Sequence, residues 1–138
     1  MTYAELENKY PSPITYDGIT YPSAENAFQA TRFKDYSERR RFSYFAPYEA
    51  EYKGAKFRST VPDWDNEKYD IMYNILKIKF SDPIFKKHLL DTGNQTIIIK
   101  NRNHEHEWGT CTCSRCRGAG NNSLGKLLMQ LRSELREN

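Results

Sequence analysis

Apolar positions along the chain recur with two periods, which predict short strands followed by longer helices. Residues 14–21 are β-prone on both sides of Asp17-Gly18, a pair typical of a two-residue hairpin turn. Ser23 then stands where the N-cap of a helix is expected. The apolar face of that helix is formed by Ala24, Ala27, Phe28 and Thr31.

Most of the remaining chain has a helical pattern. A basic, aromatic-rich helical stretch is predicted over residues 39–52, with a break near Pro47. A longer helix begins at Asp63-Trp64-Asp65 and carries apolar residues on two faces, which predicts that it is the central, most buried helix. These faces comprise Tyr69, Met72, Leu76 and Phe80 on one side and Ile71, Ile75 and Ile78 on the other.

Three further elements complete the expected fold. A helix that starts at Asp82-Pro83 is predicted to end at Thr92-Gly93, and the isoleucine-rich residues 95–100 are predicted to form a strand. Leucines mark a final helix at Leu124, Leu127, Leu128, Leu131 and Leu135. We therefore predict an α+β fold that is mainly α, a single compact domain over residues 1–138 with a short N-terminal β-hairpin and a small β component.

Composition narrows the setting of the protein. The 138 residues carry a net charge of +3 without a polybasic arm, which gives only a weak preference for an anionic partner. No apolar run approaches the ~20 residues of a membrane span, and the start of the chain lacks the pattern of a signal peptide. All three cysteines lie within residues 111–116, too few and too close for a disulfide framework. We expect a cytoplasmic protein with no membrane partner.

A long glycine-rich loop runs from Trp108 to Gly125, and such loops inside compact domains commonly bind ligands or carry catalytic residues. Its cysteines, with one upstream histidine, can supply four ligands to a structural zinc ion; the alternative is a loop of reduced thiols. The candidate ligands are Cys111, Cys113, Cys116 and either His104 or His106. The glycines and Asn122, near the helix start and Lys126, also suggest a phosphate-binding turn.

Two acidic positions are candidates for chemistry. Glu25 lies in the first turn of its helix, where the helix dipole favours a carboxylate; the alternative is an ordinary solvent-exposed acid. Glu105 and Glu107 precede Trp108 and form a carboxylate pair of the kind that acid–base chemistry requires; the alternative is a polar surface turn. The aromatic residues Tyr10, Trp64 and Trp108 either stack on a flat base or pack internally.

Several of these segments occur in an order that resembles the YbiA-like family, whose members are also called NADAR domains, for NAD and ADP-ribose. The similar blocks are Asn8 to Ile14, Tyr16 to Gly18, Tyr21 to Ala30, Asp63 to Asp65 with Lys79-Phe80, Leu89 to Gly93, and Trp108-Gly109 with Gly120 to Met129. They cover nearly the whole chain. The short length and the cysteine-bearing loop look most like phage-encoded members, for which the host cytoplasm is the expected location.

The resemblance implies an N-glycosidase that cleaves the bond between a base or amine and a ribose phosphate or ADP-ribose. Substrates described for the family are riboflavin-pathway intermediates and ADP-ribosylated guanine in nucleic acid, and no cofactor is expected to be required. Loss of the nitrogen leaving group builds positive charge on the sugar, which a fixed carboxylate stabilises. By position, Glu25 and Glu105 are the expected catalytic acids. The expected substrate-binding residues are Asn8, Tyr10, Arg32, Trp64, Trp108, Gly109, Asn122 and Lys126.

The chain departs from the family pattern at three positions. The family often has lysine at the position of Arg32, arginine at that of Ala55 and an acid at that of Lys100. A lysine at the first position can trap an opened ribose as a Schiff base, whereas arginine is too basic to do so. The changes at Arg32 and Ala55 favour an alternative, a module that binds ADP-ribose or NAD without cleaving it. A third, weaker hypothesis is a small zinc-stabilised interaction domain.

Overall fold

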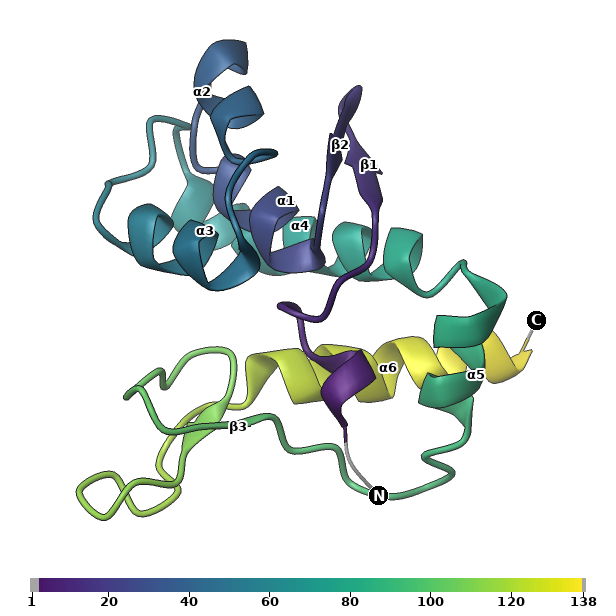
Figure 1. Cartoon of the computed structure of the whole chain (residues 1–138). Coiled ribbons are helices and arrows are strands. Elements are labelled where there is room, and N and C mark those ends of the chain that lie inside the picture. Colours follow the sequence, from purple (N-terminus) through teal and green to yellow (C-terminus); the bar gives the residue numbers. More distant parts are fainter. Residues whose placement is uncertain (1–2, 138) are drawn as a thin grey trace. The chain divides into compact units, whose positions relative to one another are not determined.

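The computed structural model describes residues 3–137 and divides into two compact units. Ala4–Phe85 forms the N-terminal unit, and the C-terminal unit runs from Lys86 and includes Tyr3, so the boundary falls inside α5 (Pro83–Leu90). Six α-helices and two two-stranded sheets make up most of the regular structure of the described residues (Figure 1). None of these helices is long and apolar enough to cross a membrane. The predicted α+β class, mainly α with an N-terminal hairpin, is confirmed.

The hairpin forms as its turn residues predict. β1 (Ile14–Tyr16) pairs antiparallel with β2 (Ile19–Tyr21), with Ile14 opposite Tyr21. Asp17 and Gly18 have φ values of 49° and 82°, and a two-residue turn between right-twisted strands requires positive φ at both positions. Ser23 then caps the next helix, because its Oγ accepts the amide N–H of Asn26 at 3.2 Å.

The central element of the N-terminal unit is α1 (Ala24–Ala30), whose seven residues are all buried. It packs against the hairpin and against α2 (Tyr36–Arg41), α3 (Pro47–Ala55) and α4 (Trp64–Lys79), which surround it in Figure 1. The prediction that α4 is the most buried helix was therefore wrong.

α1 is more completely buried than α4 because its polar side chains have hydrogen-bond partners inside the protein. Tyr69, on one expected apolar face of α4, is 38% exposed, and the buried residues of α4 follow one stripe only. In α1 the side chain of Asn26 is buried because its Nδ2 donates to the carbonyls of Phe42 and Phe45, each at 2.8 Å. A polar group that is hydrogen-bonded in this way can be buried at little net cost.

In the C-terminal unit, the predicted strand over residues 95–100 is wrong. The segment lies beside α6 (Ser123–Glu137). Among the described residues of this unit, the strands that pair are β3 (Lys100–Asn101) and β4 (Thr110–Cys111), which are parallel, and an isolated bridge joins Cys111 to Ala119. Side chains of the helical region satisfy the preceding backbone: Asn122 Oδ1 accepts the Ile99 N–H and Asn122 Nδ2 donates to the Ile97 carbonyl, each at 2.9 Å. Arg132 Nη1 donates to the Gln95 carbonyl at 2.8 Å. The isoleucine segment is thus held by side chains on or next to α6 and, at the Ile99 carbonyl, by the Thr110 N–H of β4 at 2.8 Å.

The last residue of α4, Lys79, is a buried lysine. Lys79 is 1% exposed, and its Nζ donates to the Glu7 carbonyl at 2.9 Å, at the end of the 3₁₀ helix Ala4–Leu6. The ammonium also lies 5.3 and 5.2 Å from the ring centroids of Phe80 and Phe85. Burial lowers the pKa of Lys79 from 10.5 to about 7, although Glu7 and Glu5 act in the opposite direction.

This burial predicts a pH-dependent stability. Between about pH 7 and 10.5 the unfolded chain keeps a proton on Lys79 that the folded chain has lost, so the free energy of unfolding rises with pH. Relative to Lys79→Met, the wild type is expected to gain about 1 kcal/mol per pH unit above pH 7 in urea titrations. The control Lys77→Met changes an exposed lysine of the same helix, and its pH profile is expected to run parallel to the wild type. Parallel profiles for Lys79→Met would contradict this assignment.

Candidate active site

The first site residue, Glu25, lies in the first turn of α1 and is only 7% exposed. Its amide N–H donates to the Asn8 carbonyl at 3.0 Å, and its Oε1 accepts Gln29 Nε2 at 2.9 Å. The alternative of an ordinary solvent-exposed acid is therefore wrong. A carboxylate held at a helix start and shielded from bulk water interacts strongly with any positive charge that develops beside it.

Arg32 follows α1 and is joined to the same group. Its Nε donates to Gln29 Oε1 at 2.6 Å, so one amide bridges the carboxylate of Glu25 and the guanidinium. Burial lowers the pKa of Arg32, against the attraction of Glu25 and Asp65, but a guanidinium remains protonated at any ordinary pH. The N-terminal unit thus places an anion and a cation on the two ends of one glutamine side chain.

The indole of Trp64 supports Arg32. The guanidinium carbon lies 4.3 Å from the centre of the Trp64 ring, and Trp64 Nε1 donates to Thr31 Oγ1 at 3.0 Å. The ring also packs against Phe28, with centroids 5.3 Å apart, and is 3% exposed. Because its surface is covered by protein atoms, Trp64 is a core residue that positions Arg32 and does not offer a free face to a base.

Two predicted binding residues precede the hairpin. Asn8 is 6% exposed; its Nδ2 lies 3.4 Å from Met72 Sδ, and its Oδ1 has no hydrogen-bond partner among the described residues. An unpaired buried acceptor is costly, which makes Asn8 a reasonable contact for a donor on a ligand. Tyr10 is partly exposed and meets Phe85 edge-on, with centroids 5.9 Å apart. Contact of either residue with substrate stays a prediction.

In the C-terminal unit, the carboxylate of Glu105 is surrounded by backbone amides. Its Oε1 accepts the N–H groups of Trp108 and Gly109 at 3.0 and 2.8 Å, and its Oε2 accepts those of Glu107 and Trp108 at 2.6 and 2.9 Å. The side chain of Asn101 holds the main chain of Glu105, because its Nδ2 donates to the Glu105 carbonyl and its Oδ1 accepts the Glu105 N–H. This arrangement fixes the position of the carboxylate and shapes the turn that presents the half-buried Trp108.

At the start of α6, the backbone amides of residues 121–124 are already used by carbonyls of the preceding segment, which leaves fewer donors for a phosphate than the sequence suggested. A phosphate-binding turn at this position stays a prediction. Asn121 donates to His106, Asn122 to Gly109, Ser123 to Glu107 and Leu124 to Trp108. Glu107 adds to this cap, because its Oε2 accepts Asn121 Nδ2 at 3.0 Å and Ser123 Oγ at 3.2 Å.

The other predicted binding residues of this region differ in accessibility. Lys126 is exposed on the first turn of α6, whereas Gly109 and Asn122 are buried. Both ends of the Asn122 amide are occupied by the backbone of Ile97 and Ile99. Asn122 thus has a clear structural task, and contacts of these residues with a sugar or phosphate stay predictions.

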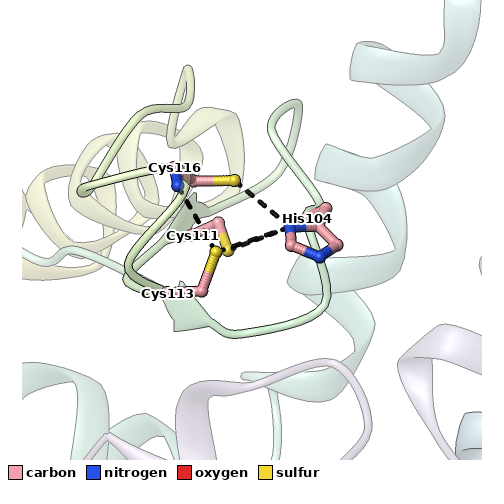
Figure 2. A group of neighbouring side chains, drawn as sticks. All are labelled: His104, Cys111, Cys113 and Cys116. Carbon is pink, nitrogen blue, oxygen red and sulfur yellow. Dashed lines mark hydrogen bonds between the residues drawn. The ribbon is translucent and has the colours of Figure 1, made fainter.

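The cysteines gather around one histidine. Sγ of Cys111, Cys113 and Cys116 lies 3.9, 3.5 and 3.2 Å from His104 Nδ1. Figure 2 shows these four side chains together. The Cys116 amide donates to Cys113 Sγ at 3.4 Å and lowers the pKa of that thiol to about 6. Burial and the neighbouring thiols raise the pKa of Cys116 to about 12.

The comparison with known protein families covers both units. The family model described as NADAR domain matches residues 2–136, almost the full length. The chain belongs to the NADAR family.

Named relatives of this NADAR chain include two kinds of protein. It is 31% identical over 137 residues to N-glycosidase YbiA of Escherichia coli (strain K12), covering 96% of this chain and 82% of that protein. It is 32% identical over 133 residues to a chloroplastic riboflavin biosynthesis protein, PYRR, of Zea mays, covering 86% of this chain but 20% of that protein. The NMR structure of E. coli YbiA matches with a TM-score of 0.80 at 30% identity, over 99% of this chain and 80% of that one.

The sequence did not single out Gln29, whose side-chain amide links the Glu25 carboxylate to the Arg32 guanidinium in this NADAR chain. Its side chain is buried, and a Cβ on Gly54 of α3 would collide with it, so Gly54 leaves the space in which Gln29 extends. The signal was present: Gln29 stands four residues after Glu25 and three before Arg32, the spacings that bring helix side chains together.

The two hydrogen bonds of Asn122 predict a stability effect separate from any ligand. Asn122 has φ of 53°, so Asn122→Gly removes the side chain without a backbone penalty. Loss of both bonds leaves the Ile97 carbonyl and the Ile99 amide unsatisfied, and the free energy of unfolding is expected to fall by about 2–4 kcal/mol in urea titrations. The exposed neighbour is the control: Asn121→Ala is expected to cost less than about 1 kcal/mol. Equal effects would refute the structural task of Asn122.

Proposed function

We propose that this NADAR protein is an N-glycosidase that hydrolyses the bond between a nitrogen and the anomeric carbon of a ribose phosphate or ADP-ribose conjugate. The observation that carries the proposal is the Glu25–Gln29–Arg32 group, in which the buried Gln29 amide bonds both the buried Glu25 carboxylate and the half-buried Arg32 guanidinium. The names of its relatives, an N-glycosidase and riboflavin biosynthesis proteins, support the same class of reaction.

In the proposed mechanism, Glu25 stabilises the charge that forms as the glycosidic bond breaks. The anomeric carbon becomes positive when the nitrogen departs with the bonding electrons, and a carboxylate shielded from water stabilises this state more than the neutral ground state. Water then adds to the anomeric carbon and loses a proton, while the departing nitrogen gains one. Gln29 holds the Glu25 side chain in one rotamer, so little reorganisation is needed at the moment of reaction.

Arg32 is proposed to bind the anionic part of the substrate. A guanidinium recognises phosphate through several parallel N–H donors, and Gln29 occupies only Nε. Because arginine does not form the Schiff base that lysine can, the proposed reaction proceeds by direct hydrolysis. A protein that only binds ADP-ribose remains the alternative, and catalytic turnover distinguishes the two.

The main role proposed for Glu105 is to position the turn that carries Trp108. Both carboxylate oxygens accept backbone amides of residues 107–109, so its strongest contacts hold the turn that carries Trp108. Direct participation of Glu105 in the reaction, as the resemblance implies, stays a prediction. We therefore propose Glu25 as the main catalytic residue.

The test of this assignment is Glu25→Gln, which keeps the shape and the acceptor for Gln29 but removes the negative charge. Release of base from ADP-ribosyl guanosine and from a ribosylamine phosphate of the riboflavin pathway is expected to slow by about 10²-fold or more, measured by chromatography of the products. Glu67→Gln is the matched control, because Glu67 is an exposed acid in the first turn of α4.

Three outcomes separate the hypotheses. Turnover by the wild type that is lost in Glu25→Gln and kept in Glu67→Gln supports the proposal. Equal rates in all three proteins would refute the role of Glu25. Tight binding of ADP-ribose by the wild type, without release of base from either substrate, would favour the binding module.

An exposed aromatic surface favours a nucleic-acid adduct as substrate over a free nucleotide. Residues 36–57, on α2, α3 and the segments beside them, expose five large aromatic side chains, Tyr36, Tyr44, Tyr48, Tyr52 and Phe57. The same segment carries five basic residues, at 39–41, 53 and 56, and Lys56 Nζ lies 4.0 Å from the Tyr52 ring centre. Aromatic rings beside cationic groups are typical of surfaces that bind single-stranded nucleic acid.

This surface predicts a difference between two substrates. The double substitution Tyr48→Ala/Tyr52→Ala, one turn apart on α3, is expected to weaken binding of an ADP-ribosylated single-stranded oligonucleotide by about tenfold or more. Cleavage of free ADP-ribosyl guanosine is expected to stay unchanged, because neither tyrosine belongs to the Glu25 group. Fluorescence anisotropy at several salt concentrations measures the first effect. An unchanged affinity for the oligonucleotide would remove the case for a nucleic-acid substrate.

A further inference from the structure

The loop between His104 and Gly118 contains a group of side chains that the proposed N-glycosidase chemistry does not use. One ligand atom each from His104, Cys111, Cys113 and Cys116 lies within 4.8 Å of the other three. Figure 2 shows the three sulfur atoms pointing toward the imidazole from a single bend of the chain. Three thiols and one imidazole are the donor set of a closed structural zinc site.

The distances fit a tetrahedral ion. Zinc–sulfur bonds of ~2.3 Å and a zinc–nitrogen bond of ~2.0–2.1 Å put nitrogen and sulfur about 3.5 Å apart at the tetrahedral angle. The three distances from His104 Nδ1 to the sulfur atoms are 3.2, 3.5 and 3.9 Å, values that lie around this length. The four donors therefore need only small side-chain shifts to meet one ion.

We propose that His104, Cys111, Cys113 and Cys116 bind one zinc ion, and that this ion fastens the glycine-rich loop to the segment before Glu105. The three cysteines bind as thiolates and release their protons to solvent. All four coordination positions come from the protein, which leaves none for substrate or water, so the ion is structural. The proposal is independent of the N-glycosidase reaction.

The geometry selects His104 over His106 as the fourth ligand. His104 Nδ1 approaches all three sulfur atoms, whereas His106 Nε2 lies 3.2 Å from Cys116 Sγ and is absent from the four-residue group. His104 has φ of 66°, a left-handed conformation that is uncommon for a residue with a side chain and that turns its ring toward the loop. His106 then lies at the edge of the site.

The backbone of the loop is already shaped around the sulfur atoms. Cys111 is fully buried in β4, and its main chain exchanges hydrogen bonds with Ala119 at 2.9 Å and Gly118 at 2.7 Å. The amide of Cys116 points at Cys113 Sγ from 3.4 Å, a bond that strengthens when the sulfur is a thiolate. Preorganised ligands lose little conformational freedom on binding, which favours a tight site.

The first test measures metal in the full-length protein. After purification without added zinc, elemental analysis is expected to find about one zinc ion per chain. After chelation, titration with cobalt(II) is expected to give the visible bands of a tetrahedral cobalt ion and the near-ultraviolet absorption of cobalt–thiolate bonds. The cobalt titration uses wild-type protein only, so it does not depend on the folding of a variant.

Substitutions then identify the ligands. His104→Ala and Cys116→Ser are expected to lower zinc affinity by at least about tenfold, while the neighbouring His106→Ala keeps it. Hydrogen exchange adds a second measurement: chelation is expected to speed the exchange of amides in residues 110–119, while those of Trp108 and Gly109, held by Glu105, stay protected. Protein that binds neither zinc nor cobalt, or equal affinity in His104→Ala and wild type, would overturn the proposal.

Discussion

The N-terminal unit depends on the satisfaction of polar groups inside α1. All seven residues of this helix are buried, and three of them, Glu25, Asn26 and Gln29, carry polar side chains. Each buried polar atom would cost free energy if it lost water without gaining a partner. Asn26 therefore fixes the carbonyls of Phe42 and Phe45, and Gln29 joins Glu25 to Arg32. The proposed catalytic group and the packing of the unit follow from the same requirement.

The backbone polar groups of the C-terminal unit also need hydrogen-bond partners, and several of these partners lie far away in the sequence. The backbone of its isoleucine segment is held by the side chains of Asn122 and Arg132, on or next to α6, and by one bond from Thr110 of β4 to the Ile99 carbonyl. Arg136 continues this pattern, with bonds to the Asn94 side chain and the Gly93 carbonyl. The final helix thus supports both the hydrophobic core of the unit and the main chain that leads to Glu105.

The parts of the fold that could be predicted from the sequence are those specified by neighbours in the chain. Asp17-Gly18 determines the hairpin, Ser23 caps α1, and the leucine spacing defines α6. The central position of α1 and the lack of a strand at residues 95–99 could not be predicted, because both depend on hydrogen bonds between residues far apart in sequence. For the site, the candidates Glu25 and Arg32 were found, but the burial of Trp64 and the amide contacts of Glu105 required the structure.

The turn that holds Glu105 is built from its own short stretch of chain. All three amides that hydrogen-bond to its side chain belong to residues 107–109, and the side chain of Asn101 holds its main chain, so the setting of this carboxylate is encoded within residues 101–109. The cysteine loop that follows, residues 111–119, contributes none of these bonds. Insertions or deletions within residues 113–119 are therefore compatible with an unchanged acid, as long as Cys111 and Thr112 keep their contacts with Asn101. Evolution can alter the length and chemistry of the loop as an independent module while the residues before it keep their arrangement.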